Sequence, residues 1–197
     1  DVLVNNAGYG LWGPLETLSD QELVNQFQTN LFGLMSLTRT LLPQIRSSEN
    51  GKIINVSSVL GRLGTPFNGA YVSSKFALEG LSESLRYELA PFGVSVSLVE
   101  PGYFETGFQS SQVRAEKSDS PSYPYQKFLN NYLVKRSRFI RPSNPDKVAK
   151  VIERIVRSKS PQFRYVVGTD AKLGILAKRL LSDKLFAYFV RKATIGQ

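Results

Sequence analysis

The sequence predicts an α/β fold built around a parallel sheet. Three short apolar runs alternate with two long helical patterns over about the first hundred residues. Strands that alternate with helices form parallel sheets with right-handed crossovers. The chain has 197 residues, the length of one domain, and 42% of them are hydrophobic, which is ordinary for a globular protein. We therefore expect one α/β domain over residues 1–197.

The five elements of this first part are identified by their periodicity and by the Gly, Pro and Asn residues between them. In order, they are the strand Val2–Asn5, the helix Asp20–Arg46, the strand Lys52–Ser57, the helix Tyr71–Ala90 and the strand Val94–Val99. The first helix carries a leucine stripe that we expect to pack on the sheet. The second helix is apolar on more than one face, which predicts a second buried contact, such as a subunit partner.

The rest of the chain predicts a covering segment, a helix, a last strand and a basic tail. Residues 103–140 are crowded with Tyr and Phe, and Pro145 lies in the first turn of a helix that we expect to end near Ser158. Arg164–Val167 indicates a short strand. The tail, residues 170–192, alternates Leu and Phe with Lys and Arg. It fits contact with an anionic membrane, a cover over a pocket, or packing against a partner, and we favour packing.

Composition excludes several kinds of chemistry. The chain has no Cys and no His, so thiol catalysis, Ser-His hydrolysis and zinc sites built from thiolates or imidazoles are excluded within these residues, and we expect no metal. Without Cys there is no disulfide, which fits a reducing compartment. We therefore expect a cytoplasmic protein, with peripheral membrane contact through the tail as the alternative. The sequence contains no run of eighteen apolar residues, so it gives no indication of a membrane span.

The net charge of +9 fits a nucleic acid, an anionic membrane or a phosphorylated cofactor. The basic residues are spread along the chain and no nucleic-acid motif is present, so we expect no nucleic-acid partner.

Tyr71 and Lys75 carry the strongest functional signal. They lie four residues apart in a predicted helix, so their side chains share one face. A phenol and an ammonium both have an ordinary pKa of about 10. A fixed cation at Lys75 should lower the pKa of Tyr71 and make it a proton donor and acceptor near neutral pH. The same spacing occurs on many surface helices, so it predicts catalysis only together with other residues.

Polar residues at the predicted strand ends supply those other residues. Ser58 lies thirteen positions before Tyr71, at the carboxyl end of a parallel strand, where α/β sheets bind ligands. Its hydroxyl can donate to a substrate carbonyl oxygen, or it simply caps the next turn. Asn30 interrupts a helical pattern as a poor helix former, so it is either exposed or held for a purpose. Pro101-Gly102 ends the third strand and turns the chain toward Thr106.

The run Asn5-Asn6-Ala7-Gly8 closes the first predicted strand. Together with it, these residues resemble in order and spacing the short-chain dehydrogenase/reductase family over residues 1 to about 107. The resemblance implies a Rossmann-like doubly wound parallel sheet and an NAD(P)-dependent oxidoreductase that moves a hydride between nicotinamide and a carbonyl or secondary alcohol. It implies that Tyr71 is the acid/base, that Lys75 lowers its pKa and bonds the nicotinamide ribose, that Ser58 polarises the carbonyl, and that Asn30 holds a water. The cofactor-binding residues that it implies are Asn6, Ala7, Gly8, Tyr71, Lys75, Pro101, Gly102 and Thr106.

The resemblance also implies a substrate lid over residues 103–140 and a homo-oligomer. The aromatic density of the lid favours a lipophilic substrate, such as a steroid, retinoid or fatty compound, with ordinary core packing as the equal alternative. The cofactor is NADP or NAD, and the basic balance favours NADP. The alternative function is a nicotinamide-binding sensor or scaffold without turnover. A basic membrane- or nucleic-acid-binding module is a further rival.

The family begins with three strands and a Gly-rich pyrophosphate turn that have no counterpart here. We therefore expect an N-terminally truncated fragment, the C-terminal part of the fold. The segment Gly8–Gly13 fits G-x-G-x-x-G, but Pro14 follows it and the next helix begins only near Ser19-Asp20. We interpret it as a flexible Gly-rich loop lining the site rather than as the pyrophosphate loop.

Overall fold

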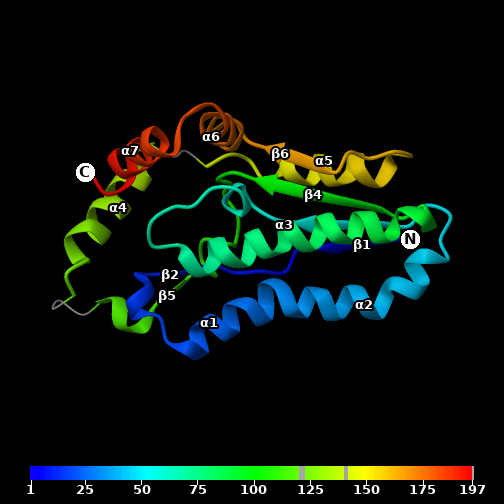
Figure 1. Ribbon diagram of the computed structural model, residues 1–197, viewed down its shortest axis with the longest axis horizontal. Helices are drawn as coiled ribbons and strands as arrows, with labels where there is room; N and C mark the ends of the chain where they lie inside the picture. The colour runs from blue at the N-terminus through cyan, green and yellow to red at the C-terminus, as the bar shows by residue number, and fades with distance from the viewer. Residues whose placement is uncertain (120–122, 140–141, 197) are drawn as a thin grey trace.

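The computed structural model describes residues 1–119, 123–139 and 142–196. Figure 1 shows a parallel sheet with helices on both of its faces. The four strands of the main sheet lie in the order β1-β3-β4-β6, and all neighbours are parallel. Their bounds are β1 Val2–Asn5, β3 Lys52–Val56, β4 Ser95–Pro101 and β6 Arg164–Val167. The predicted α/β fold with a Rossmann-like parallel sheet is confirmed.

Consecutive residues of β3 face opposite layers of the core. Ile53 packs in a cluster with residues of the helices on one face, including Ile45 and Leu85. Ile54 packs on the other face with Ile155 of a different helix. Both isoleucines are fully buried, which is the pattern of a strand covered on both faces.

The predicted helix Asp20–Arg46 is continuous in the structure, but its middle is a π-helical turn between two α-helices. Helix α1, Asp20–Phe27, begins at a capping box formed by Ser19 and Glu22. A π-helical turn, Gln28–Phe32, then leads into α2, Gly33–Arg46. π-helical turns are rare and are frequent at functional sites. This one contains Asn30.

Helix α3, Gly69–Leu89, runs antiparallel to the strands and covers the same face of the sheet as α2 (Figure 1). Its buried side is polar in the first half, at Tyr71, Ser74 and Lys75, and apolar in the second half, at Leu85 and Leu89. The apolar half packs on the sheet. The polar half passes the carboxyl ends of the strands, where the candidate site lies.

The opposite face of the sheet is covered by α5, Asp146–Arg157, which packs on β3, β4 and β6. Its N-terminal turn is held by Asn144, whose Oδ1 accepts the Asp146 N–H at 2.8 Å. The bounds agree with the predicted helix to within a few residues.

A second, small sheet ties the covering segment to the Gly-rich loop. Strand β2, Leu11–Trp12, pairs in parallel with β5, Val113–Arg114. The sequence predicts a flexible loop over Gly8–Gly13, and this is wrong for Leu11–Trp12, because backbone pairing with the covering segment makes them a strand. The next helix begins at Asp20, as predicted, so this segment does not lead into a helix N-terminus.

Three further α-helices complete the set of α-helices in the described residues. Helix α4, Gln126–Phe139, belongs to the predicted covering segment and packs against the last helix. The basic tail forms two helices, α6 at Thr169–Leu180 and α7 at Asp183–Thr194, separated by a break at which Ser182 caps α7. Within the described ranges, no helix has both the length and the apolar character needed to cross a bilayer.

Candidate active site

The carboxyl ends of three parallel strands meet at one edge of the sheet. Strand β1 ends at Asn5, β3 at Val56 and β4 at Pro101. Open α/β sheets bind their ligands outside this edge. The polar half of α3 passes here, and it brings Tyr71 and Lys75 to residues that follow β3.

Ser58 contacts Tyr71 and also caps the next turn. Its Oγ accepts the Leu60 N–H at 3.1 Å and begins the short 3-10 helix Val59–Gly61. Because the cap uses the oxygen as an acceptor, the hydroxyl hydrogen remains available, and Ser58 lies close enough to the Tyr71 phenol to act on its pKa in the lowering direction. The two interpretations of Ser58 that the sequence offers are therefore compatible.

The Lys75 ammonium is held by the end of β3. Its Nζ donates to the Val56 carbonyl oxygen at 2.9 Å, and it lies 5.8 Å from the centre of the Tyr71 ring. Burial lowers the pKa of Lys75 to about 8, while the nearby Glu79 carboxylate acts in the raising direction. Only 5% of Lys75 is exposed.

The pKa of Tyr71 differs in direction from the sequence prediction. Burial raises the pKa of Tyr71 to about 12, and the hydrogen bond from Ser58 acts in the lowering direction. The sequence predicted a net lowering of the pKa of Tyr71, and this net direction is wrong for the chain by itself. The physical reason is that both groups are buried, so desolvation outweighs their mutual effect, and the ammonium donates to Val56.

Asn30 is buried and fully engaged with its neighbours. Its Oδ1 accepts the Tyr9 N–H at 3.0 Å, and its Nδ2 donates to the Tyr9 carbonyl at 2.9 Å and to the Ser74 Oγ at 3.1 Å. The side chain thus joins the Gly-rich loop to α3, one residue from Lys75. The sequence left open whether Asn30 is exposed or held for a purpose, and the structure shows that it is held.

The residues around the Lys75 ammonium fit a ligand that carries hydroxyl groups. An ammonium has three donors, and in the described part of the chain one of them is engaged by Val56. A Cβ added at Gly8 would lie 3.7 Å from Lys75 Nζ and 3.2 Å from Asn30 Oδ1, so a larger residue would fill the space beside the ammonium. Asn6 and Ala7 are exposed at the end of β1. A nicotinamide ribose has hydroxyls suited to this donor set.

The turn after β4 is held in place by the start of α6. The Gly102 N–H donates to the Val167 carbonyl at 2.8 Å, and the Tyr103 N–H donates to Asp170 Oδ2 at 2.8 Å. A Cβ added at Gly102 would lie 2.3 Å from the Asp170 carboxylate, so a larger residue would have to displace the carboxylate that accepts the Tyr103 N–H. Pro101 ends β4 at the predicted edge.

Thr106 lies further along this turn and is exposed. Its Oγ1 accepts the Phe108 N–H at 3.2 Å, and its N–H donates to Gln109 Oε1 at 3.0 Å. Thr106 is therefore bonded within the covering segment, whereas Asn30, Ser58, Tyr71 and Lys75 form one buried group.

Phe108 covers this group and was not singled out as a site residue by the sequence. Its ring lies 5.6 Å from that of Tyr71, and a Cβ added at Gly10 would meet Phe108 Cζ at 3.2 Å. The covering segment therefore contacts the candidate acid/base directly. Its aromatic crowding indicated a lid but could not say which ring meets Tyr71.

Two polar supports of the site were also missed. Asn55 accepts from Asn5 Nδ2 at 2.8 Å and donates to Ser82 Oγ at 2.9 Å, which joins β1, β3 and α3. Gln26 accepts the Leu11 N–H and donates to the Tyr9 carbonyl, so it holds the Gly-rich loop four residues before Asn30. The sequence carries a signal for each support: Asn55 lies inside an apolar strand, and Gln26 and Asn30 are two amide side chains four residues apart in a helix.

Comparison with known proteins agrees with this geometry. Residues 1–117 match the short chain dehydrogenase family. The chain is 38% identical to 3-ketodihydrosphingosine reductase of Bacteroides thetaiotaomicron, over 97% of this chain and 71% of that protein. It is 42% identical to bovine (Bos taurus) retinol dehydrogenase 8, over 86% of this chain and 56% of that protein.

A solved structure of a short-chain dehydrogenase from Streptomyces avermitilis superposes with a TM-score of 0.79 at 34% identity, covering 98% of this chain and 68% of that one. A short chain dehydrogenase from Burkholderia cenocepacia, solved in complex with NADP, shares the fold with a TM-score of 0.67 at 24% identity, over 95% of this chain and 67% of that one. The chain belongs to the short-chain dehydrogenase family of oxidoreductases.

Proposed function

We propose that this protein is an NAD(P)-dependent oxidoreductase that interconverts a carbonyl group and a secondary alcohol. The observation that carries the proposal is the buried contact between Ser58 and Tyr71, with the Lys75 ammonium beside the same ring. When bound, the nicotinamide supplies or accepts the hydride. The chain's own residues then have to orient the carbonyl and move one proton.

The proton moves at the Tyr71 phenol. In the reducing direction the Tyr71 O–H protonates the alkoxide oxygen, and in the oxidising direction the phenolate takes the alcohol proton. Ser58 donates its hydroxyl hydrogen to the same oxygen and stabilises the negative charge that develops there. The charge of Lys75 favours the phenolate form that Tyr71 must pass through. Asn30 keeps the Gly-rich loop against α3, and we propose that it also orders the water that links Lys75 to solvent.

We propose that the cofactor lies along the strand ends, with NADP favoured over NAD by the net charge of +9. Lys75 and Tyr71 would contact the nicotinamide ribose. The other residues proposed to line the cofactor site are Asn6, Ala7, Gly8, Pro101, Gly102 and Thr106. Burial of the reacting group under Phe108 excludes water, which strengthens each of these polar contacts.

The substrate is proposed to be lipophilic. Aromatic rings of the covering segment meet Tyr71 and the loop before α3, since Phe108 contacts Tyr71 and Tyr132 packs edge-on against Phe67 at 5.7 Å. Two of the relatives are named for 3-ketodihydrosphingosine and retinol, which are both lipophilic compounds. A fatty ketone or a retinoid suits such a surface better than a sugar does.

The test is to follow the absorbance of reduced nicotinamide with purified protein, NADPH or NADH, and a panel of long-chain ketones, retinoids and short polar ketones. We expect turnover with long-chain substrates, preferentially with NADPH. The variant Ser58→Ala should reduce the rate about a hundredfold, the typical loss for one oxyanion donor. Saturable cofactor binding without turnover on any carbonyl would instead support the sensor or scaffold function.

A second copy of the chain is the proposed partner for the outer face of α2 and α3. Phe32, Met35, Leu37 and Phe76 are exposed there, and a groove lined by Phe32, Met35, Leu81 and other residues runs between the two helices. Such an apolar patch marks an interaction surface. Sedimentation of Phe32→Glu should give a smaller particle than wild type, and an unchanged particle would contradict this partner.

The tail is proposed to contact an anionic membrane. Leu173, Leu176 and Leu180 follow helical spacing on α6 and are 66%, 51% and 72% exposed, and Phe189 on α7 is 51% exposed. Residues 170–192 carry six Lys or Arg against two Asp. Exposed apolar residues flanked by cations suit a lipid surface. This exposure now favours membrane contact over the packing that the sequence suggested, within a protein that we still expect to be cytoplasmic.

Vesicle sedimentation tests this contact. Vesicles with phosphatidylserine should bind the protein more tightly than neutral vesicles, and Leu180→Glu should weaken the binding. The control is Leu15→Glu, a residue that is 71% exposed outside the tail. Equal losses in both variants, or no preference for anionic lipid, would contradict the proposal.

A further inference from the structure

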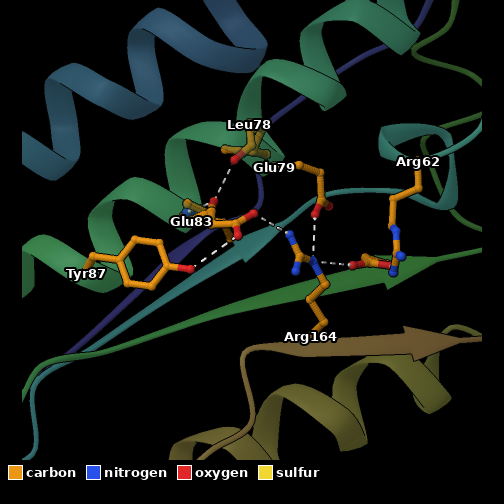
Figure 2. A network of polar contacts seen from close by, with 9 residues as sticks. Arg62, Leu78, Glu79, Glu83, Tyr87 and Arg164 are labelled. Atoms are coloured by element: carbon orange, nitrogen blue, oxygen red, sulfur yellow. Dashed lines mark hydrogen bonds and ion pairs between the residues drawn. The ribbon is translucent and has the colours of Figure 1, made fainter. Parts of the chain in front are cut away.

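Behind the candidate active site, Arg164 lies among three carboxylates (Figure 2). Arg164 is the first residue of β6, and its Nε lies 3.2 Å from Glu79 Oε2 and 3.4 Å from Glu100 Oε1. Its Nη2 lies 3.1 Å from Glu83 Oε2. Arg62 Nη1 approaches the other Glu100 oxygen at 3.5 Å. The cluster therefore joins α3, β4, β6 and the turn after Ser58.

The charges of this cluster do not balance within it. Glu79, Glu83 and Glu100 supply three negative charges, whereas Arg62 and Arg164 supply two positive ones. The Glu100 side chain is fully buried and that of Glu79 is 9% exposed. A buried excess of negative charge is costly unless another cation lies close to it.

Lys75 is the buried cation that neighbours the cluster along α3. It lies on α3 one helical turn before Glu79, so the two side chains share the buried face of the helix. Glu79 Oε2 is engaged by Arg164, whereas Glu79 Oε1 is buried and has no hydrogen-bond partner among the described residues. Arg164 of β6 thus fixes one oxygen of the Glu79 carboxylate, and the other oxygen can act on neighbouring groups such as Lys75 only through its charge.

The other groups around Lys75 cannot serve as its counter-charge. On its own helix the neighbouring titratable group is the Tyr71 phenol, which is neutral below its raised pKa of about 12. The end of β3 offers the uncharged carbonyl of Val56, and the π-helical turn offers the uncharged amide of Asn30. Glu79 is the carboxylate whose charge acts on Lys75, and it opposes the effect of burial.

We propose that Glu79 is a positioning residue for the reaction: a buried carboxylate, fixed by Arg164, that keeps Lys75 protonated beside Tyr71. The inference rests on the proposed function, because Lys75 matters only if Tyr71 exchanges a proton with substrate. It assigns a role to a residue whose side chain acts on Lys75 through charge and, in the described part of the chain, has no hydrogen bond with Tyr71 or Ser58. It also explains why an arginine from the edge strand β6 reaches across β4 to a helix.

The test compares Glu79→Gln with Glu83→Gln in the pH dependence of kcat/KM. Both substitutions keep the shape of the side chain and remove one carboxylate from Arg164, Glu79 at a buried position and Glu83 at a half-exposed one. Only Glu79 lies one turn from Lys75. We expect the basic limb of the Glu79→Gln profile to move down by about one pH unit, which gives roughly a fivefold loss at pH 8, about a tenfold loss well above pH 8 and almost none near pH 6.

Glu83→Gln should leave the basic limb where it is in wild type. A merely structural role for Glu79 would lower the rate equally at every pH, and such a uniform loss, or coincident limbs in wild type and Glu79→Gln, would overturn the inference. If Glu79→Gln does not fold, Glu79→Asp retains the charge on a shorter side chain and should give a smaller shift in the same direction.

A titration that does not need turnover separates this inference from the proposed function. The ¹³Cε resonance of Lys75 reports its protonation directly, and its midpoint should lie near pH 8 in wild type and lower in Glu79→Gln. If the Lys75 midpoint is lower in Glu79→Gln but the protein is inactive on every carbonyl tested, the role of Glu79 is supported and the proposed reaction is contradicted. Equal midpoints in an active enzyme would overturn the role of Glu79 and leave the reaction intact.

Discussion

Lys75 Nζ lies 2.9 Å from the carbonyl oxygen of Val56, the last residue of β3. Ser58 follows Val56 by two residues, so one strand end positions both the ammonium and the hydroxyl that meet Tyr71. The precision of the candidate site therefore comes from the sheet rather than from a loop. Two of its side chains are fixed through the backbone of a strand that is buried on both faces.

Replacement of Lys75 by Met should change how stability depends on pH. The pKa of Lys75 is lowered by burial from an ordinary 10.5 to about 8. Between those values the unfolded chain binds a proton that the folded chain has lost, so stability rises with pH there. Relative to Lys75→Met, wild type should gain about 1.4 kcal/mol of unfolding free energy per pH unit between roughly pH 8 and 10.

Urea denaturation of the two proteins at several pH values measures this difference. Groups other than Lys75 titrate in both proteins, so they cancel in the comparison. If the difference in unfolding free energy between wild type and Lys75→Met does not change between roughly pH 8 and 10, the Lys75 ammonium is not desolvated in the folded protein.

Asn55→Ala should destabilise the fold. Asn55 is fully buried, and its loss leaves Asn5 and Ser82 without the partners that they bond at 2.8 and 2.9 Å. Unsatisfied buried groups of this kind cost about 1–3 kcal/mol each, so we expect a loss of about 2–4 kcal/mol in unfolding free energy. Asn50→Ala, at an exposed position, should change it by less than about 0.5 kcal/mol. Similar values for the two variants would contradict the role of this amide chain.

Phe108→Ala should weaken substrate binding more than it slows the chemical step. The ring covers Tyr71 at 5.6 Å, and its removal exposes the site to water and deletes an apolar contact. We expect KM for a lipophilic ketone to rise about tenfold, which corresponds to roughly 1.4 kcal/mol of lost apolar contact. Phe92→Ala, at an exposed ring over Arg46, is the control and should leave KM unchanged. An unchanged KM in Phe108→Ala would remove this ring from the substrate site.

The regular elements could be predicted because their signals are local. Strands Val2–Asn5 and Arg164–Val167 were predicted with the bounds that the structure has, and the helices differ by a few residues at their ends. Apolar periodicity and Gly or Pro boundaries act within one segment, so they need no knowledge of the partner. The break in the tail was missed because Leu181 and Ser182 continue its apolar and polar alternation.

The chemistry of the site could be predicted only in part because it depends on burial. The sequence brought Ser58, Tyr71 and Lys75 together, but it predicted a lowered pKa for Tyr71 where desolvation raises it. Desolvation depends on which residues cover the group, and here the cover is Phe108, which is thirty-seven positions from Tyr71. Arg164 reaches Glu79 from eighty-five positions away, which no local pattern indicates.

Tyr71→Phe tests the central proposal most directly. The substitution removes the phenolic oxygen and keeps the ring, so cofactor binding and folding should persist while the proton can no longer be exchanged with substrate. Tyr87→Phe is the matched control, because Tyr87 lies on the same helix and is 64% exposed. The two variants and wild type are compared by kcat with a lipophilic ketone and by titration with NADPH. We expect kcat of Tyr71→Phe to fall at least about a hundredfold with unchanged NADPH affinity, and Tyr87→Phe to match wild type. Turnover of Tyr71→Phe close to that of wild type would contradict the assignment of Tyr71 as the acid/base.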